Sequence, residues 1–351
     1  MMDGTVLERV DCLKRLRALL DEIDGSRITL IGDTMLDRYH HGYSNNLNST
    51  APVPVMKVIR SEESPGASAH IAMGLNSLGM QVSFHSCVGD DREGATISKM
   101  LSDCGISTEQ IAVANEMQTL TKIRFYGSRE SLLEKSQILL QADRGPLEPL
   151  STEISDVLTK SALDSLENSC ALVISDYDKG VISQPGAAML IHEARDLGIP
   201  VIVDPKLTGL EKSRDATVIL FEIRGMDLLR RRLMLEDSSE TAAHLFGTYG
   251  WDALVALGGV NGVTLYQSDG SEVHIPCMSP APEQQIGLHD AAATALAAAL
   301  GHGYSMVDAA SLVAAACECV LTAESSREFV DKDTLGLWID ELSWQMQISD
   351  R

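Results

Sequence analysis

The sequence lacks the features of several large classes of protein. No apolar run approaches the ~20 residues that a membrane-spanning helix needs. The first residues, with acidic Asp3, Glu8 and Asp11, lack the basic and then apolar pattern of a signal peptide. The 7 cysteines are odd in number and show neither a CxxC motif nor zinc-site spacing, which is typical of reduced thiols. We therefore expect a soluble cytoplasmic protein.

Basic residues are scarce. There are 28 Lys and Arg against 50 Asp and Glu, a net charge of -22, which argues against nucleic acid or an anionic membrane as a partner. An anionic substrate would need a local basic patch or a metal ion. The first expected strand ends in Gly32-Asp33-Thr34 and lacks a Gly-x-Gly-x-x-Gly turn, which argues against a dinucleotide-dependent oxidoreductase. The 9 histidines do not cluster, which argues against a metallohydrolase.

Apolar runs and helical patterns alternate along the chain with short links. This rhythm predicts an α/β protein with a doubly wound, mainly parallel sheet. No internal repeat or long linker interrupts it, so we expect one domain over residues 1–351. The expected strands are 27–32, 82–88, 171–177, 201–206, 217–221, 253–257 and 263–266, and the expected helices are 5–23, 66–78, 93–101, 157–168, 185–197, one through about 246, 290–300 and 307–322.

Two stretches of strand-like sequence break the rhythm, at about 34–60 and 118–143. We expect them to form a small β lid that projects from the main sheet. Lys122 and Arg124 lie in the second stretch. They could hold a phosphate group, although a solvated strand face is the commoner reason for scattered basic residues.

The turn Gly287-Leu288-His289-Asp290 runs directly into an Ala-rich segment that ends at Leu300. A glycine and an aspartate before a strong helix former predict a loop that leads into a helix N-terminus. Free backbone N–H groups and the helix dipole favour an anion there. Asp290 could accept a proton from an attacking hydroxyl, or it could only cap a buried helix.

Five segments carry a likeness to one family: Gly32 to Tyr39, Ala51 to Val55, Ser175 to Val181, Asp204 to Lys206 and the turn at Asp290. They resemble the ribokinase-like (PfkB) sugar kinases, and within them the heptose-7-phosphate kinases of ADP-heptose synthesis. The likeness covers roughly residues 25–325, and we expect no nucleotidyltransferase domain of the kind fused in that family. The resemblance implies a ribokinase-like fold, with ATP and Mg²⁺ as cofactors.

The resemblance also implies roles for individual residues. Asp290 would be the base, and Gly287 and His289 would belong to its anion-binding turn. Asp33 would accept hydrogen bonds from sugar hydroxyls. The lid would cover the sugar and pair two subunits in a homodimer. The other substrate-binding positions would be Asp37, Arg38, Gly66, His70, Lys122, Arg124, Asp176 and Lys179, and the nucleotide-binding ones Lys206, Gly259, Gly262 and Glu222.

The chain departs from the family pattern at its functional sites. The Gly-Ala-Gly-Asp turn has become Gly287 to Asp290 with a histidine as its third residue. The Asn-x-x-Glu pattern after strand 217–221 has become Glu222 to Gly225, which leaves the metal-binding residues unknown. Gly-Gly-x-x-Asn has become Gly66 to His70, and Glu318 replaces a glycine near the nucleotide.

These changes leave two hypotheses open. The first is an ATP-dependent sugar kinase with weakened catalysis. The second is a catalytically inactive pseudokinase that binds a sugar phosphate or nucleotide, or serves as a subunit of an assembly.

Overall fold

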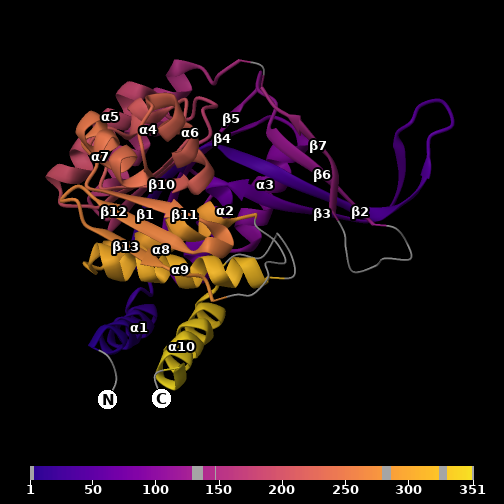
Figure 1. Ribbon diagram of the computed structural model, residues 1–351. Coiled ribbons are helices and arrows are strands. Elements are labelled where there is room, and N and C mark those ends of the chain that lie inside the picture. The colour runs from indigo at the N-terminus through magenta and orange to yellow at the C-terminus, as the bar shows by residue number, and fades with distance from the viewer. Residues whose placement is uncertain (1–3, 129–136, 147, 279–285, 324–329, 350–351) are drawn as a thin grey trace.

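A large sheet runs through the middle of the protein, whose computed structural model describes residues 4–128, 137–146, 148–278, 286–323 and 330–349 (Figure 1). In these residues its strands have the order β13-β12-β11-β10-β9-β8-β1-β4-β5. β12 and β13 pair antiparallel, and the other strands pair in parallel, as predicted. The strands are β1 (Arg27–Gly32), β4 (Gln81–Gly89), β5 (Ile111–Ala114), β8 (Ala171–Asp176), β9 (Val201–Pro205), β10 (Val218–Glu222), β11 (Ala253–Leu257), β12 (Val263–Gln267) and β13 (Glu272–Ile275).

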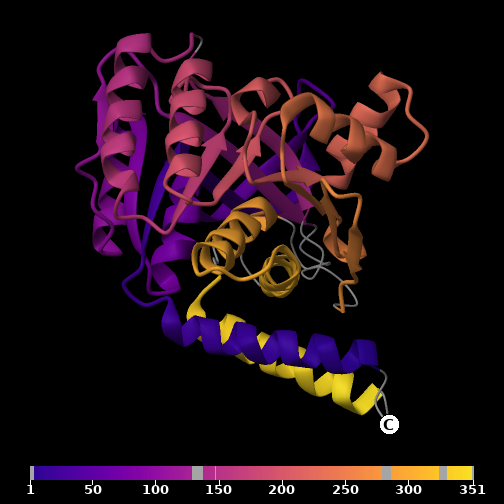
Figure 2. The same ribbon diagram turned by 90° about the vertical axis from the view of Figure 1, so that its left-hand side faces the viewer.

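Helices cover both faces of this sheet (Figure 2). One face carries α4 (Thr152–Leu166), α5 (Gln184–Asp196), α6 (Ile223–Leu233) and α7 (Ser238–Tyr249). The other carries α1 (Gly4–Glu22), α2 (Ser68–Ser77), α3 (Arg92–Asp103), α8 (Leu288–Gly301), α9 (Met306–Thr322) and α10 (Lys332–Ser349). None of the helices within the described residues combines the length and the apolar character needed to cross a membrane.

The central strands are apolar on both sides because both sides are covered. Successive side chains point to opposite faces of a strand, so neighbours enter different layers. Leu30 packs in the cluster under α8 and α9, and Ile31 in the cluster under α4 and α5. In β8, Val173 joins the first cluster and Ile174 the second. The same alternation decides toward which face of the sheet each polar side chain at a strand end points.

A second sheet projects from the main body and forms the lid (Figure 1). Its strand order is β3-β2-β6-β7, with β2 (Thr34–Leu47), β3 (Pro54–Ala67), β6 (Leu120–Ser128) and β7 (Gln137–Arg144). The predicted strand-like stretches are therefore strands, although 129–136 lies outside the described residues. β3 continues to Ala67, so the helix expected from residue 66 begins at Ser68.

Two parts of the helical prediction were wrong. The single helix expected after strand 217–221 is divided into α6 and α7, because Met234 adopts a left-handed conformation and Asp237 caps a new helix by accepting from the Glu240 N–H. No helix was expected at α10. This helix packs against α1 on the α9 side of the protein (Figures 1 and 2).

Ala67 joins the lid to α2 with an unusual backbone. Its φ of 54° and ψ of -130° lie in a region that glycine occupies readily and that a Cβ atom disfavours. Such a conformation costs on the order of 1 kcal/mol or more. Two hydrogen bonds of the next residue offset this cost, because Ser68 donates both its backbone N–H and its hydroxyl to the Asp33 carbonyl.

We expect Ala67→Gly to leave the free energy of unfolding unchanged or to raise it. Relief of the backbone strain opposes the loss of a buried methyl group and the greater freedom of glycine in the unfolded chain. Ala72→Gly, which is buried inside α2, has no strain to relieve and should cost about 1 kcal/mol or more. Urea denaturation of both variants makes the comparison. Equal losses in the two variants would contradict strain at Ala67.

Candidate functional site

Acidic side chains gather where four neighbouring strands end. Asp33 follows β1, Asp176 ends β8, Asp204 is the second-last residue of β9, and Glu222 ends β10. The register pairs Gly32 with Ser175 and Ser175 with Asp204, so the ends lie level across the sheet. Ligands of open α/β sheets bind at such carboxyl ends. This edge of the sheet is therefore the candidate site.

The N-terminus of α8 lies over this edge. Gly287 is its N-cap with φ 95°, a conformation suited to glycine, and Asp290 is in the first turn. Residues 291–299 are all buried, because α8 packs against α2, α9 and the strands β8, β9 and β10. Alanine fits where a helix is surrounded on several sides. The turn before Asp290 is thus held by a fully buried helix.

Asp290 makes one ion pair and leaves one oxygen available. Its Oδ2 lies 3.1 Å from Nδ1 of His70, and its side chain is 13% exposed. Its Oδ1 has no hydrogen-bond partner among the described residues. Burial lowers the pKa of His70, but hydrogen bonding and charge from Asp290, with charge from Asp37, leave that pKa raised overall. The carboxylates of Asp290 and Asp37 therefore favour the protonated form of His70.

Two consecutive turns of α2 and α8 make this pair possible. Gly74 stands one turn after His70, and a Cβ atom there would lie 2.8 Å from Oγ1 of Thr294. Thr294 stands one turn after Asp290 and donates its hydroxyl to the Asp290 carbonyl at 2.8 Å. The missing side chain of Gly74 lets the helices approach closely. The contact one turn earlier then brings imidazole and carboxylate together.

His289 is held between two carboxylates. Its Nδ1 lies 2.7 Å from Oδ1 of Asp204, and its Nε2 lies 3.5 Å from Oε1 of Glu222. Burial lowers the pKa of His289, yet the two carboxylates together raise it to about 10. Hydrogen bonding from His289 in turn lowers the pKa of Glu222. The third residue of the turn is therefore a cation at neutral pH, and its ring points to the strand ends.

Asp33 organises the loop that follows β8. It is 1% exposed, and its carboxylate accepts three backbone N–H groups, from Tyr177 at 2.8 Å, Lys179 at 3.1 Å and Val181 at 3.2 Å. Burial and the charge of Asp176 raise the pKa of Asp33 to about 6. The prediction that Asp33 binds sugar hydroxyls stays a prediction, and these bonds give the carboxylate a structural part in the loop.

Lys212 neutralises the next carboxylates of the same loop. Its Nζ lies 3.0 Å from Oδ1 of Asp176 and 3.1 Å from Oδ1 of Asp178. Asp176 is 1% exposed, and burial raises its pKa despite Lys212. The Asp178 N–H also bonds to Asp176. Asp176 therefore belongs to an ion-pair network, and Lys179 contributes its backbone N–H to Asp33.

The lid brings a buried ion pair to the site. Nη1 of Arg124 on β6 lies 2.6 Å from Oδ1 of Asp37 on β2, and both side chains are largely buried. Gly66 on β3 makes room for this pair, since a Cβ there would lie 2.3 Å from Oδ2 of Asp37. The structure thus brings together three of the positions predicted for the substrate, Asp37, Gly66 and Arg124.

Two lysines face one aromatic ring in the site. Nζ of Lys206 lies 3.9 Å from the ring centroid of Tyr177, and Nζ of Lys122 lies 5.4 Å from it. Cation–π contact holds both ammonium groups near the loop after β8. Lys122 from the lid and Lys206 from the main sheet therefore lie together, which the sequence alone did not indicate.

Arg38 lies apart from these groups. Its guanidinium contacts Glu63 at 2.7 Å and Glu93 at 3.2 Å, and it links the lid to α3. Arg144 also contacts Glu93, at 2.8 Å. Arg38 donates hydrogen bonds to both Glu63 and Glu93, and its predicted role in substrate binding stays a prediction.

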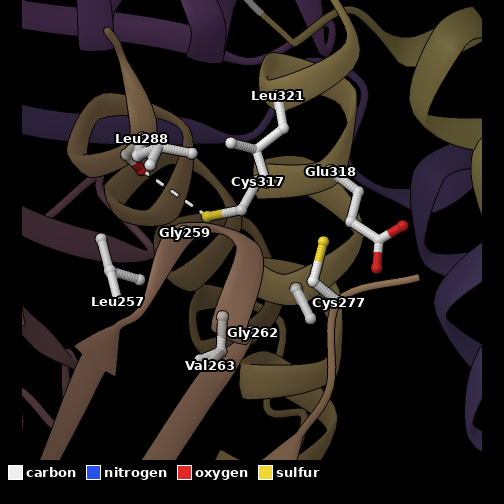
Figure 3. A pocket seen from close by; sticks show the side chains of 10 residues that line it. Leu257, Gly259, Gly262, Val263, Cys277, Leu288, Cys317, Glu318 and Leu321 are labelled. Carbon is white, nitrogen blue, oxygen red and sulfur yellow. Dashed lines mark hydrogen bonds between the residues drawn. The ribbon is translucent and has the colours of Figure 1, made fainter. Parts of the chain in front are cut away.

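A narrow pocket, with about 10 Å³ of space for a water-sized molecule, adjoins the turn before α8 (Figure 3). Leu257, Gly259 and Gly262 line one side, and Leu288 connects the pocket to the turn. Cys317 donates its Sγ–H to the Leu288 carbonyl at 3.8 Å, and Figure 3 shows this contact as a dashed line. The lining of this pocket is largely apolar.

Glu318 is the polar exception in this pocket. It is 3% exposed, its Oε1 accepts the Met278 N–H at 2.8 Å, and burial raises its pKa. Its Oε2 has no hydrogen-bond partner among the described residues. The predicted glycines Gly259 and Gly262 have φ values of 58° and 83°, which allow the backbone to turn closely around the pocket.

Carboxylates do not form a metal cage here. Within the described ranges, no group of three or more His, Cys, Asp or Glu side chains is placed to hold a metal ion. Mg²⁺ commonly binds through one or two carboxylates, substrate phosphates and several waters, so such a cage is not required for it.

Sequence reasoning missed three residues of the site. Asp204 pairs with His289, Tyr177 packs against two lysines, and Lys212 neutralises Asp176. Asp204 had a signal, because it ends an apolar strand just as Asp33 and Asp176 do. The position of Lys212, in a short 3₁₀ helix after β9, gave no comparable signal.

Comparison with known proteins places this geometry in one family. The family described as pfkB family carbohydrate kinase matches residues 26–333. The bifunctional protein HldE of Shewanella piezotolerans is 30% identical over 303 residues, which cover 86% of this chain and 61% of that protein. HldE of Escherichia coli O157:H7 is 30% identical over 308 residues, 87% of this chain and 62% of that protein. The chain thus spans about three fifths of these relatives.

Solved structures show the same fold. A putative ribokinase from Agrobacterium tumefaciens has a TM-score of 0.71 at 17% identity, and the match covers 92% of this chain and 99% of that one. Arabidopsis thaliana ribokinase complexed with ribose and ATP has a TM-score of 0.68 at 16% identity, covering 90% and 99%. Escherichia coli phosphofructokinase-2 with substrates and products has a TM-score of 0.72 at 16% identity, covering 91% and 99%. The fold is ribokinase-like, and the chain belongs to the pfkB family of carbohydrate kinases.

Proposed function

We propose that the chain transfers the γ-phosphoryl group of ATP to a hydroxyl of a sugar or of a heptose-7-phosphate-like sugar phosphate. One observation supports this above the others: Asp290 presents a buried oxygen, Oδ1, that has no partner among the described residues. A buried acceptor without a donor is unfavourable unless a ligand supplies one. A sugar hydroxyl is such a donor. The heptose-type substrate rests on the resemblance of the sequence motifs.

Asp290 would act as the general base. Its Oδ1 takes the proton of the attacking hydroxyl, whose oxygen forms the new bond to phosphorus. The bond from phosphorus to the bridging oxygen breaks, and its electron pair stays on that oxygen. The first N–H groups of α8, after Gly287, would stabilise negative charge on the transferring group. Because α8 is buried, these donors need little rearrangement during the reaction.

The sugar would lie between the lid and the strand ends. Asp37 and Arg124 form a fixed donor and acceptor pair beside Asp290, and Gly66 leaves space for them. Lys122 supplies a positive charge from the lid that could contact a sugar phosphate. Closure of a lid of this kind excludes water from the reacting groups. Asp33 would act by shaping the loop of Lys179.

The nucleotide would bind at the pocket beside the turn, whose walls would move apart to admit the base. Gly259 and Gly262 let the backbone approach the ligand, the apolar lining suits a base, and Lys206 lies near the path of the phosphates. Glu318 Oε2 offers an acceptor at the margin of the pocket. These residues fit ATP, which when bound supplies the γ-phosphoryl group. Mg²⁺ would neutralise phosphate charge, and we assign no side chain to it.

The presence of His289 in the turn supports slow catalysis. It also supports the second candidate function, a binding protein without turnover. Its ring lies where the family turn has glycine, and its charge is already compensated by Asp204 and Glu222. An imidazolium so paired attracts a phosphate less than a free cation would. A pseudokinase that binds a sugar phosphate or nucleotide, or that serves in an assembly, would keep the fold and show no transfer.

We further propose a homodimer that forms through the lid. The edge strands β3 and β7 carry large apolar side chains that are open to solvent, and bare sheet edges are usually covered. A second copy would cover the same surface symmetrically. The exposed side chains on these edge strands are Val55, Val58 and Ile59 on β3 and Ile138 and Leu140 on β7, and Leu47 at the end of β2 and Val53 just before β3 are exposed as well.

Asp290→Asn should abolish transfer while leaving nucleotide binding intact. The amide keeps the shape of the side chain but accepts protons poorly, so kcat should fall by at least about 100-fold. ADP release with Mg²⁺, ATP and heptose 7-phosphate measures the rate, and isothermal titration measures ATP affinity. Asp227→Asn, at a partly exposed position on α6, is the matched control. Transfer by Asp290→Asn at the wild-type rate would contradict the assignment, and no ATP binding at millimolar concentration would favour an assembly role.

The charged state of His289 should show in the pH dependence of stability. Because its folded pKa, about 10, lies above the ordinary histidine value, its stabilisation is fully present below about pH 6.5. That stabilisation is lost as pH rises through the folded pKa. Urea unfolding across this range should therefore show a steeper loss of stability for wild type than for His289→Asn. Parallel curves would contradict the paired imidazolium.

Leu140→Glu should convert the dimer to a monomer. A carboxylate on β7 would repel its symmetry mate and would have to lose water on association. Light scattering coupled to size exclusion measures the mass of each variant. Met189→Glu, at an equally exposed apolar position on α5, is the control and should remain dimeric. A monomeric wild-type protein, or a dimeric Leu140→Glu variant, would contradict assembly through the lid.

A further inference from the structure

His70 faces the proposed base from a different helix. It lies on α2, and its Nδ1 is 3.1 Å from Oδ2 of Asp290 on α8. Its ring is also near Gly287, since a Cβ there would lie 3.4 Å from Cε1 of His70. The imidazole thus touches both ends of the turn that leads into α8. His70 is buried, so the ring cannot turn away into solvent.

The charges around His70 favour its protonated form. Two carboxylates face it, Asp290 from α8 and Asp37 from β2, and Arg124 compensates Asp37. Burial opposes the charge on the ring, but the two carboxylates outweigh burial. One turn further along α8, the side chain that meets α2 is the uncharged Thr294, which lies against Gly74. The proton on His70 therefore depends mainly on the Asp290 carboxylate.

This contact has two effects on Asp290. It holds Oδ2, which leaves Oδ1 as the oxygen that faces a substrate hydroxyl. The charge of the ring also matters, because a protonated His70 attracts the negative charge that Asp290 would otherwise present to a substrate hydroxyl. The position of Asp290 and its interaction with a substrate therefore both depend on His70.

We propose that His70 is a positioning residue that orients Asp290 and whose own proton must leave before Asp290 can act efficiently as the base. This inference rests on the proposed function. In the active form, neutral His70 holds Oδ2 through an Nδ1–H hydrogen bond. The proton of the sugar hydroxyl then passes to Oδ1, and the oxygen of that hydroxyl bonds to the phosphorus of ATP, with ADP as the leaving group. In the acid form, imidazolium and carboxylate stay paired and transfer is slow.

His70→Asn separates the two effects. The asparagine amide can donate a hydrogen bond to Oδ2 but cannot carry a proton. We expect kcat near neutral pH to remain within about tenfold of wild type, and the acid limb of the kcat/KM profile to move to lower pH by about one unit or more. His70→Ala removes the hydrogen bond as well and should lower kcat at every pH.

A titration that does not depend on activity tests the pair directly. NMR of the ¹⁵N-labelled imidazole rings follows the protonation of His70 in wild type and in Asp290→Asn. Loss of the carboxylate charge should lower the pKa of His70, while the exposed His244 on α7 should titrate alike in both proteins. His244→Asn identifies the control resonance and should leave the pH profile of transfer unchanged.

The outcomes are distinguishable. A lower His70 pKa in Asp290→Asn, together with an acid limb that moves in His70→Asn, supports the inference. Transfer with the same acid limb in wild type and His70→Asn overturns it and leaves the proposed function standing. An unchanged His70 pKa in Asp290→Asn also overturns it. If the His70 pKa falls in Asp290→Asn but the wild-type protein transfers no phosphoryl group at any pH, the proposed function is overturned. The role of the His70 proton in transfer is then overturned with it.

Discussion

The burial of α8 is the constraint on which the rest of the site depends. Nine consecutive residues of this helix are buried, so it can neither slide nor rotate without breaking contacts with α2, α9 and three strands. The turn before Asp290 is held in place because it is continuous with this helix. The lid and the strand ends therefore meet a fixed group of backbone donors and one fixed carboxylate. A preorganised electrostatic site needs such a support.

Most of the fold could be predicted because its elements repeat a simple physical pattern. Strands such as β1, β8 and β9 are short apolar runs that end in acidic residues, and the helices between them have regular apolar spacing. The expectation failed for α10, although Leu335, Ile339 and Leu342 do have helical spacing. It failed also for α6 and α7, which are separated by a backbone conformation at Met234 that propensity does not reveal.

The candidate site was predictable as a set of positions but not as a set of pairs. A strand end indicated Asp33 and a helix start indicated Asp290, since topology alone brings such points together, and the family resemblance indicated Asp176. Which side chains then touch is decided by helix crossing and by local space. His70 and His289 looked like departures from a pattern, and the structure shows each as one half of an ion pair. Those pairings join residues more than 80 positions apart in sequence.

The close contact between Gly74 and Thr294 controls the distance between His70 and Asp290, one helical turn away. A side chain at 74 would wedge the helices apart at one turn, and His70 and Asp290 would separate at the next. Two buried groups would then lose their partners, so a small steric defect would become an electrostatic one. Selection for phosphoryl transfer would therefore also act on Gly74. This glycine matters because its missing side chain lets α2 and α8 approach each other, and not because it contacts substrate or nucleotide.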